Sequence, residues 1–504
     1  MRLSLDLKLS RDVVKLAWPV ILGMLSQTSV NLVDTILIGW MKDETVSVAG
    51  VAGIGITLPL YWAVGGFISS ISVGTQAITA RRFGEKQDSL AGRVLSNSLL
   101  VAFSIGILLS IAGFLLIPYV FPFFNSNPEV LKQGVPYAQY RFAAVLAMVA
   151  TISYKSFFDG IGMTYIHMVA SIVMNIANIV LNILLIFGLA GFPEMGVPGS
   201  GLGTCIASYI GLAIIMGWSF GPSLRKKYQY YRARNFNFPV IREVLRLSLP
   251  GGMATVVVMT GFLLFLKIVG IIDRAEWLAA FPHGAVVGID ETLNAYLRGT
   301  HGEDLLGLLV TMLPQVDTMT EAMRSPVYTA GTKVIMDLMS ISFMSAIAIG
   351  TATATLVSQN LGKGKPGLAE RYGWEAVKIG AFVLGGLGIA EAIFPHIFLN
   401  IFTDKQAVIN AAATSLRMIG MVNFMVAAGL IFMNALFGAG NAKFVMYTEF
   451  TLHFTCLVPL AYLFGIHFKL GMEGVWLSGV VYIISLASIL GWKFWQGKWK
   501  HIKI

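Results

Sequence analysis

The sequence predicts an all-α polytopic membrane protein, in which twelve transmembrane helices form two six-helix lobes related by an internal repeat. Of the 504 residues, 56% are hydrophobic and only 12% are charged, a composition typical of integral membrane proteins. Apolar runs of about 20 residues, the length needed to cross about 30 Å of hydrocarbon, recur along nearly the whole chain. Short motifs also return at a fixed distance in the second half.

Each apolar run is predicted to form one membrane-spanning helix, with boundaries set by hydropathy alone. The first run follows a charged start, MRLSLDLKLSRDVVK, and is too long for a secretory signal peptide, so it is expected to remain as a helix. The twelve predicted spans are 15–39, 50–75, 94–120, 136–157, 164–189, 197–219, 247–271, 328–357, 374–401, 411–437, 443–466 and 471–494.

The formal net charge of +10 is concentrated in three clusters, after the second span, between the sixth and seventh spans, and in the tail. A twelve-helix count places all three on one side, which the positive-inside rule makes cytoplasmic. We therefore expect a multi-pass protein of a bacterial inner membrane with both termini in the cytoplasm. A nucleic-acid-binding patch is the alternative, but no DNA-binding motif accompanies these clusters.

The halves are related by a repeat. "FGEKQDSLAGR" (83–93) resembles "LGKGKPGLAER" (361–371), and "FDGIGMT" resembles "LFGAGNA", both at an offset of 278 residues (362 − 84). The first helices align at a smaller offset, 231 (250 − 19), which matches Pro19 to Pro250. The difference of 47 (278 − 231) predicts an insertion in the second half, within 273–325.

The predicted insertion falls on the extracytoplasmic face, where its short apolar run suggests one or two interfacial helices. It is either a cap that gates access or a surface elaboration. The resulting organisation is a cytoplasmic segment 1–14, an N-lobe 15–219, a basic cytoplasmic linker 220–246, a C-lobe 247–494 containing the insertion, and a basic tail 495–504.

The two halves are expected to enter the membrane in the same orientation, because each contains an even number of spans. Parallel repeats of this kind are related by an axis along the membrane normal. A cleft between two such bundles is the usual arrangement for alternating access, which indicates a transporter by analogy of fold.

A single carboxylate, Asp34 in "NLVDTILIGW", lies inside the first span. It follows Pro19 by 15 residues, or about 22 Å along a helix, so we expect it deep in the outer half of the membrane. An ionised Asp there costs a few kcal/mol and needs a partner or water. The alternative is a structural Asp satisfied by hydroxyls or amides.

The fifth span supplies candidate partners for this acid. Asn178 and Asn182 are four residues apart and share one helical face, and Ser200, at the start of the sixth span, lies at similar depth. A carboxylate, two amide carbonyls and a hydroxyl form an oxygen cage that suits Na⁺, or else a protonatable acid. Asn pairs also hold helices together in lipid, which is the structural alternative.

Three further polar residues are candidates for a substrate cavity: Asp337, Lys155 and Gln76. Asp337 aligns with Pro59 and would be a replacement acid on the C-lobe side, or would lie at the outer interface. Lys155 approaches a helix end, where snorkelling to the interface is the alternative. A cation within the cavity would favour anionic or zwitterionic substrates.

Several motifs together resemble the multidrug and toxic compound extrusion (MATE) family, especially its NorM-type branch. They are "PVILGMLSQTSVNLVDTILIG", the pair "GTQAITARRFGEK" and "GTATATLVSQNLGKGK", and "NIVLNILLIFGLAGFPEMGVPGSGLGT". The resemblance covers all but the insertion and the tails.

The resemblance implies two lobes forming a V, and export of amphipathic, often cationic compounds in exchange for Na⁺ or H⁺. It assigns the coupling role to Asp34, Asn178, Asn182 and Ser200. Some members carry Asp where this chain has Asn182, a departure that mildly favours Na⁺ coordination over a two-carboxylate proton site.

The second lobe departs from the NorM pattern. Members of that branch carry a Glu in the seventh helix and an Asp in the tenth, where this chain aligns Val258 and Val426. Neither Val can bind a cation, so coupling is expected to rest on the first lobe, and specificity for cationic drugs is not implied.

The function predicted is therefore a cation-coupled antiporter, not an enzyme, that exports amphipathic small molecules or drugs. We expect no cofactor beyond Na⁺ or H⁺, no nucleic-acid partner, contact with membrane lipid, and a monomer. The alternative is a flippase for a lipid or a lipid-linked headgroup. An integral-membrane enzyme is disfavoured, because the chain lacks HExxH, GxSxG, paired metal ligands and a phosphate loop.

Overall fold

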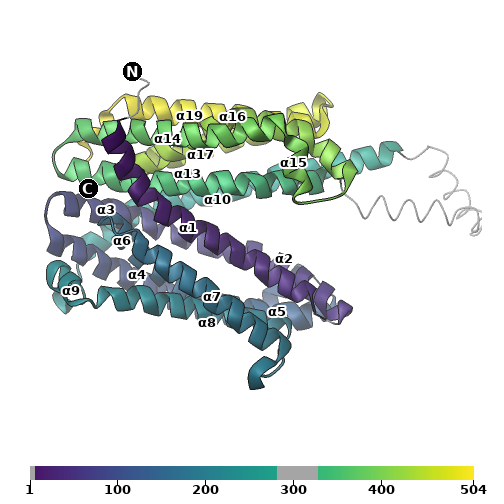
Figure 1. Cartoon of the computed structure of the whole chain (residues 1–504), viewed down its shortest axis with the longest axis horizontal. Coiled ribbons are helices and arrows are strands. Elements are labelled where there is room, and N and C mark those ends of the chain that lie inside the picture. The colour runs from purple at the N-terminus through teal and green to yellow at the C-terminus, as the bar shows by residue number, and fades with distance from the viewer. Residues whose placement is uncertain (1–5, 42, 126, 281–326) are drawn as a thin grey trace, which may run out of the picture.

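The computed structural model describes residues 6–41, 43–125, 127–280 and 327–504, and the regular secondary structure of these residues is helical (Figure 1). Most of the predicted insertion, with its expected short helices, lies outside the described residues. Its first residues, 273–280, continue the seventh helix beyond the predicted boundary.

The N-lobe contains the first six spans. The fourth is longer than predicted, beginning at Pro128, and divides at Ala144 into two helices. The elements are α1 (Leu7–Gly39), α2 (Glu44–Ser69) with α3 (Ile71–Gly84), α4 (Asp88–Val120), α5 (Pro128–Ala143) with α6 (Val145–Gly160), α7 (Tyr165–Phe187) and α8 (Val197–Ser219), followed in the linker by α9 (Pro222–Tyr228).

The C-lobe contains the other six. Its eleventh span is one helical path with two π-helical turns. The elements are α10 (Phe238–Ala280), α13 (Val327–Gly362), α14 (Pro366–Ile393), α15 (Pro395–Asn400), α16 (Gln406–Gly438), α17 (Ala442–Leu452) continuing through η4 (His453–Leu457), α18 (Val458–Tyr462) and η5 (Leu463–His467), and α19 (Gly471–Trp495) with η6 (Lys498–His501). Within the described residues, ten helical segments are long and apolar enough to cross a membrane, and the predicted twelve-helix, two-lobe fold is confirmed.

Two helices, α1 and α10, each belong to both lobes. In Figure 1, α1 runs diagonally from the C-lobe to the N-lobe. Its first half, including Val13, packs into the core of α13, α14 and α16, whereas its second half, including Ile38, packs into the N-lobe. The equivalent helix of the second half, α10, crosses in the opposite direction. Val244 in its first half packs with the N-lobe, and Phe265 in its second half packs with the C-lobe.

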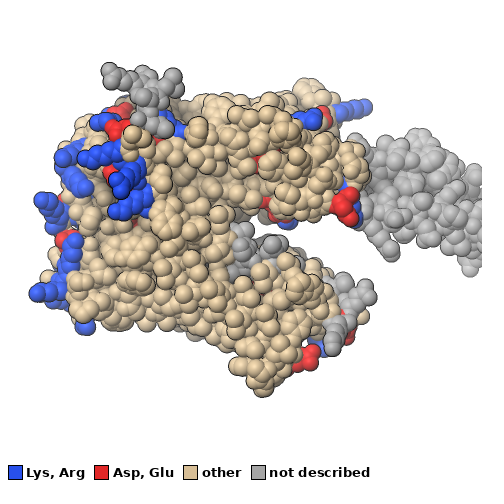
Figure 2. Space-filling model, in the orientation of Figure 1, with Lys and Arg blue, Asp and Glu red and all other residues tan. Residues whose placement is uncertain are grey.

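The lobes meet at one end of the molecule and diverge at the other. Figure 2 shows Lys and Arg gathered at the end where the lobes meet, which we call the basic end, and a cleft that widens away from it. The start of α1 and the C-terminus both lie at the basic end (Figure 1). The opposite end is the open end.

The repeated glycines explain how the lobes approach so closely at the basic end. A Cβ atom on Gly84 would lie 2.1 Å from the Gln359 carbonyl oxygen, and one on Gly362 would lie 2.2 Å from that of Arg81. Gly84 and Gly362 are equivalent in the repeat, so each closes the gap between α3 and α13 from its own side. Only glycine leaves room for this backbone contact.

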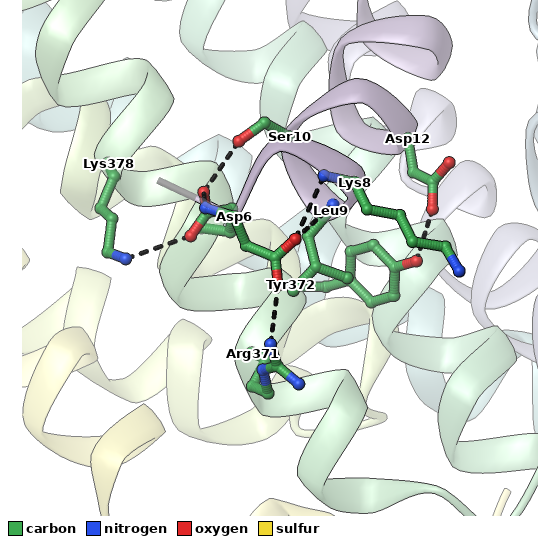
Figure 3. A network of polar contacts seen from close by, with 9 residues as sticks. Asp6, Lys8, Leu9, Ser10, Asp12, Arg371, Tyr372 and Lys378 are labelled. Atoms are coloured by element: carbon green, nitrogen blue, oxygen red, sulfur yellow. Dashed lines mark hydrogen bonds and ion pairs between the residues drawn. The ribbon is translucent and has the colours of Figure 1, made fainter. Parts of the chain in front are cut away.

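The start of α1 is tied to α14 by a polar network (Figure 3). The Asp6 amide and the Ser10 hydroxyl donate to Glu375 Oε1 at 2.7 and 2.8 Å, and Arg371 Nη2 lies 2.7 Å from Asp6 Oδ2. Tyr372 donates to Asp12 at 2.7 Å.

The start of α10 is tied to α4 in the equivalent place. The Asn237 amide donates to Asn97 Oδ1 at 2.9 Å, and the amide group of Asn97 donates to the Asn235 carbonyl at 2.8 Å. Asn97 and Glu375 are 278 residues apart (375 − 97). At equivalent positions of the two halves, a polar side chain therefore binds the start of the crossing helix. This side chain is a neutral amide, Asn97, in the N-lobe and a carboxylate, Glu375, in the C-lobe.

The tail is part of the contact between the lobes. Trp499 is fully buried and stacks on Phe494, with ring centroids 4.6 Å apart. Arg81 of α3 donates to the Ile502 carbonyl at 3.3 Å, and Ile504 packs against the N-lobe core. The predicted basic tail therefore folds back between the lobes at the basic end.

Candidate functional site

Asp34 lies in the second half of α1 and is 1% exposed. It meets α7 and α8, two neighbouring helices of the N-lobe. The α7 sequence places its polar side chains three or four residues apart, so they share one face of the helix. The buried polar residues of this face are His167, Ser171, Asn175, Asn178 and Asn182.

The structure brings Asp34, Asn178 and Asn182 into one hydrogen-bonded group. The amide nitrogen of Asn182 donates to Asp34 Oδ1 at 2.5 Å and also lies 3.4 Å from Asn178 Oδ1. The amide nitrogen of Asn178 donates to the Thr204 hydroxyl at 2.9 Å. The expected side-chain pairing on α7 and its contact with Asp34 are both present.

Thr204 of α8 completes the group. Its hydroxyl lies 3.3 Å from Asp34 Oδ2 and 2.9 Å from the Ser200 carbonyl oxygen. A hydroxyl has one proton to donate and can also accept. When it donates to Ser200, its oxygen can accept a proton carried by Asp34, and when it donates to Asp34, it stabilises the ionised acid.

Two buried oxygens at this site have no hydrogen-bond partner among the described residues: Asn182 Oδ1 and the Ser200 hydroxyl. Buried polar atoms are rarely left unpaired, because desolvation without a partner costs free energy. Together with the Asp34 carboxylate and Asn178 Oδ1, they provide the oxygen donors that a hard cation prefers. The residues present therefore fit a bound Na⁺ as well as a proton on Asp34.

Arg141 places a second charge beside this group. It lies near the end of α5, in the middle of the span Pro128–Gly160, and is 6% exposed. Its guanidinium interacts electrostatically with Asp34 and lies over the Tyr61 ring, 4.8 Å from the centroid. The Arg141 charge reduces the net negative charge available at the site to attract another cation.

Lys155 and Gln76 lie closer to the basic end than to the Asp34 group. Lys155 Nζ lies 2.6 Å from Asp159 Oδ2, and the Asp159 side chain is fully buried. The pairing shows that Lys155 does not snorkel. Gln76 of α3 donates to the Thr351 carbonyl and the Thr355 hydroxyl of α13, both at 2.9 Å, so it bridges the lobes where they meet.

Asp337 does not join the Asp34 group. It lies on α13 and pairs with Lys333 one turn earlier, at 2.5 Å, and its side chain is 40% exposed. Its charge is therefore compensated by a neighbour on the same helix.

Two residues of the site escaped the sequence analysis, Thr204 and Arg141. Thr204 follows Ser200 by one helical turn, a spacing that could have identified it. Arg141 is an arginine in the interior of an apolar span, and such residues usually mark a functional site. The helix-pairing information that places it beside Asp34 is not local in the sequence.

The family is decided by a match to the family model MatE, which covers residues 19–184 and 305–463. The chain belongs to the MatE family. The two matched stretches fall in the two halves of the repeat, and the predicted MATE resemblance is confirmed. The chain is therefore a membrane transporter, as predicted, and not an enzyme.

Curated relatives of similar length support this assignment. A "Probable multidrug resistance protein NorM" of Thermotoga maritima is 24% identical over 501 residues, covering 98% of this chain and 94% of the relative. A relative from Mesorhizobium japonicum with the same name is 23% identical and covers 94% and 92%. An "Uncharacterized transporter YisQ" of Bacillus subtilis is 22% identical and covers 92% and 89%.

Solved structures share the fold. One, described as an outward-facing conformation of a multidrug resistance MATE family transporter, superposes with a TM-score of 0.79 at 18% identity and covers 98% of this chain and 97% of that one. A transporter from Pyrococcus furiosus, described as having a binding pocket of reverse polarity, gives a TM-score of 0.78 at 18% identity and covers 97% and 95%.

The C-lobe of this transporter has valines where the NorM pattern has acids. Val426 is 4% exposed and packs within the C-lobe core, and Val258 is half-buried on α10. Neither position offers an oxygen to a cation. Any electrostatic attraction for a coupling ion near the Asp34 group therefore comes from the N-lobe.

Proposed function

We propose that this MatE transporter exports amphipathic small molecules, including drugs, in exchange for Na⁺ or H⁺ bound at Asp34. The observation that supports this most is the buried group of Asp34, Asn178, Asn182 and Thr204, which retains unpaired oxygens inside a membrane bundle. The names of the NorM relatives support drugs as substrates.

The basic end is cytoplasmic in this proposal, since it carries the Lys and Arg clusters (Figure 2). Both termini then lie in the cytoplasm of a bacterial inner membrane. The lobes touch at that end and the cleft widens away from it, so the structure corresponds to an outward-open state. Alternating access requires the lobes to separate at the basic end and close at the open end.

Residues of the N-lobe would hold a coupling Na⁺ as follows: Asp34 supplies charge, and Asn178, Asn182, Thr204 and Ser200 supply neutral oxygens. For a coupling proton, Asp34 is the acceptor and Thr204 the hydrogen-bond partner of both protonation states. In either case the bound cation joins Arg141, and the local charge becomes positive.

Exchange follows from that charge. When no coupling ion is bound, the negative charge of Asp34 and the positive charge of Arg141 nearly cancel. With a coupling cation bound, a cationic substrate in the same cleft would be repelled, because charge interactions are strong where water is excluded. Ion and substrate therefore favour opposite steps of the cycle, and the ion gradient shifts the population of the two states.

The test is export of a fluorescent cationic dye from proteoliposomes, driven separately by a Na⁺ gradient and by a pH gradient. We expect one gradient to drive export and Asp34→Asn to reduce the rate at least about tenfold, since the neutral amide has no negative charge to offer Na⁺ and does not accept a proton near neutral pH. Asp404→Asn is the matched control, because Asp404 is exposed in the C-lobe. Native protein that moves no dye under either gradient would rule out the drug-exporter proposal.

A further inference from the structure

We propose that Glu449, His453 and Tyr482 form a second, proton-binding site inside the C-lobe. The site is separate from Asp34, and its part in coupling rests on the proposed transport function. Glu449 and His453 are each 2% exposed. Both lie in the apolar span Ala442–His467, where an unpaired ionisable group would be costly.

The three side chains contact one another directly. The Tyr482 hydroxyl donates to Glu449 Oε2 at 2.8 Å, and His453 Nδ1 lies 3.3 Å from the same oxygen. His453 Nδ1 also lies 2.9 Å from the Glu449 backbone oxygen. Since that carbonyl can only accept, Nδ1 carries a hydrogen, and the second ring nitrogen, Nε2, is the one that gains or loses a proton.

The backbone is distorted at this point. A π-helical turn, η4, begins at His453, and the Val458 amide donates to the His453 carbonyl, five residues back. The cause is Pro459, which has no amide hydrogen to donate and cannot continue the normal α-helical pattern. Turns of this kind are rare and occur frequently at functional sites.

The site occupies the place that the internal repeat assigns to the acid group of the N-lobe. Tyr482 is equivalent to Thr204 (482 − 278), and both hydroxyls lie beside the carboxylate of their own lobe. Glu449 and His453 map onto the polar face of α7, one to two turns from Asn178. Their equivalents there are Ser171 and Asn175.

In both lobes the titratable group meets a helix that crosses between the lobes. Asp34 lies on α1 itself. In the C-lobe, α10 approaches His453 so closely that a Cβ atom on Gly261 would lie 2.4 Å from His453 Cδ2. A change of charge on His453 and Glu449 therefore acts directly on the packing of α10, which contacts both lobes.

Few other charges reach the site among the described residues packed around it. Cys456 on η4 and Tyr482 on α19 belong to the surrounding C-lobe cluster. Lys493 of α19 lies over the Phe444 ring, near the basic end. Arg417 on α16 and Lys267 on α10 are exposed, and both lie toward the open end of their helices.

The chemistry is a reversible gain of one proton from water. With one ionisable proton shared between them, His453 and Glu449 are either both neutral or an ion pair, and the net charge is zero. Uptake of a second proton leaves a neutral acid beside an imidazolium, with a net charge of +1.

Infrared difference spectroscopy between about pH 5 and pH 8 tests the site without requiring transport. The background is Asp34→Asn, which removes the acid of the N-lobe. We expect this protein to show a pH-dependent carboxyl band and an imidazole band. Adding Glu449→Gln should remove the part of the carboxyl band that changes together with the imidazole band, while the new amide oxygen still accepts from Tyr482 and keeps the fold.

Glu391→Gln is the matched control, since Glu391 is a C-lobe acid that is 3% exposed and makes no ion pair with a histidine among the described residues. It should leave the imidazole band unchanged, whereas Glu449→Gln should alter that band, because the Glu449 carboxylate lies 3.3 Å from His453 Nδ1. A spectrum that Glu449→Gln leaves unchanged would overturn the site.

The coupling role is tested by the pH profile of export with Asp34 intact. Glu449→Gln should flatten that profile, with the largest loss of rate, about tenfold, at the pH where the native protein is most active. If Glu449→Gln shows the same pH profile of export as the native protein, the coupling role is overturned. If the native protein exports nothing, the proposed function fails, and the infrared spectra still decide whether the C-lobe site exists.

Discussion

Asp34 and Arg141 set the charge of the N-lobe site, and the neutral residues around them set its hydrogen bonding. The acid has two oxygens, and each faces a donor, the Asn182 amide on one side and the Thr204 hydroxyl on the other. Small changes to these neighbours should therefore alter ion binding without removing the acid.

Thr204→Val removes the hydroxyl while keeping the shape of the side chain. We expect the initial rate of gradient-driven dye export to fall about tenfold, because one hydrogen bond to a charged group contributes about 1.5–3 kcal/mol. Thr204→Ser should restore most of the rate. Equal rates for the Val variant and the native protein would show that the hydroxyl takes no part.

Arg141→Gln removes the cation that competes with the coupling ion. We expect the ion concentration that gives half-maximal export to fall about tenfold, since each pKa unit or decade of affinity corresponds to 1.36 kcal/mol of interaction. Arg141→Lys keeps the charge and is the matched control. The measurement is the export rate as a function of ion concentration, and an unchanged or higher half-maximal concentration would contradict the electrostatic argument.

At the scale of the elements, the contact between α3 and α13 holds the lobes together at the basic end. The glycines of the repeat make this contact possible, and Ser358 adds a hydrogen bond across it, from its hydroxyl to the Ala77 carbonyl at 2.7 Å. At Gly84 and Gly362 the contact between α3 and α13 is made by backbone atoms, so neither position has room for an added side-chain atom.

Gly84→Ala should destabilise the structure with the cleft open by about 1–3 kcal/mol, the usual cost of overpacking. Gly367→Ala is the control, because a Cβ atom there meets nothing within 4 Å and alanine favours helix. The thermal unfolding midpoint in detergent should fall for the first variant and not for the second. A Gly84 variant as stable as the control would mean that the lobes do not meet as closely as described.

For the whole molecule, the position of the lobes depends on how firmly α1 and α10 are anchored in the opposite lobe. Glu375 of α14 anchors α1 by accepting two hydrogen bonds from the start of that helix. Its carboxylate also lies 3.1 Å from Lys378 of the same helix. Loosening the anchor should let the lobes separate at the basic end.

Glu375→Ala is expected to raise the population in which the cleft is closed at the open end. Spin labels at residues 123 and 401, on exposed sites of the two lobes, would report the separation of the open ends, with both native cysteines replaced by serine. Glu473→Ala is the control, because Glu473 is exposed on α19 of the C-lobe. Identical distance distributions for the two variants would argue against anchoring by Glu375.

Much of this structure could be predicted from the sequence because helices in a membrane have fixed rise and fixed length. Depth counted along a helix placed Asp34, Asn178 and Asn182 together. Ser200 is linked to this group through its carbonyl oxygen, which accepts from Thr204, and the position of its hydroxyl depends on a rotamer that is not written in the sequence. Arg141 was missed because its proximity to Asp34 depends on how α5 packs beside α1.

The buried pair Lys155 and Asp159 shows a different limit. Their spacing of four residues predicts an ion pair on one helical face, yet the position of Lys155 near a helix end favoured snorkelling instead. The packing of α6 against α3 and α13 decided between the two. Gly160, the next residue, brings these helices together, and no local pattern reports that contact.

The seating of Ile504 between the lobes has a practical meaning for labelling. Any polypeptide attached after this residue must leave from the region where α3 meets the tail, beside the bond from Arg81 to Ile502. A fluorophore or affinity tag fused there would be enclosed by the two lobes in one state of the transport cycle and exposed to solvent in the other. The emission of the fluorophore, or the accessibility of the tag, would therefore report each transport cycle. A bulky fusion would keep the two lobes apart at the basic end.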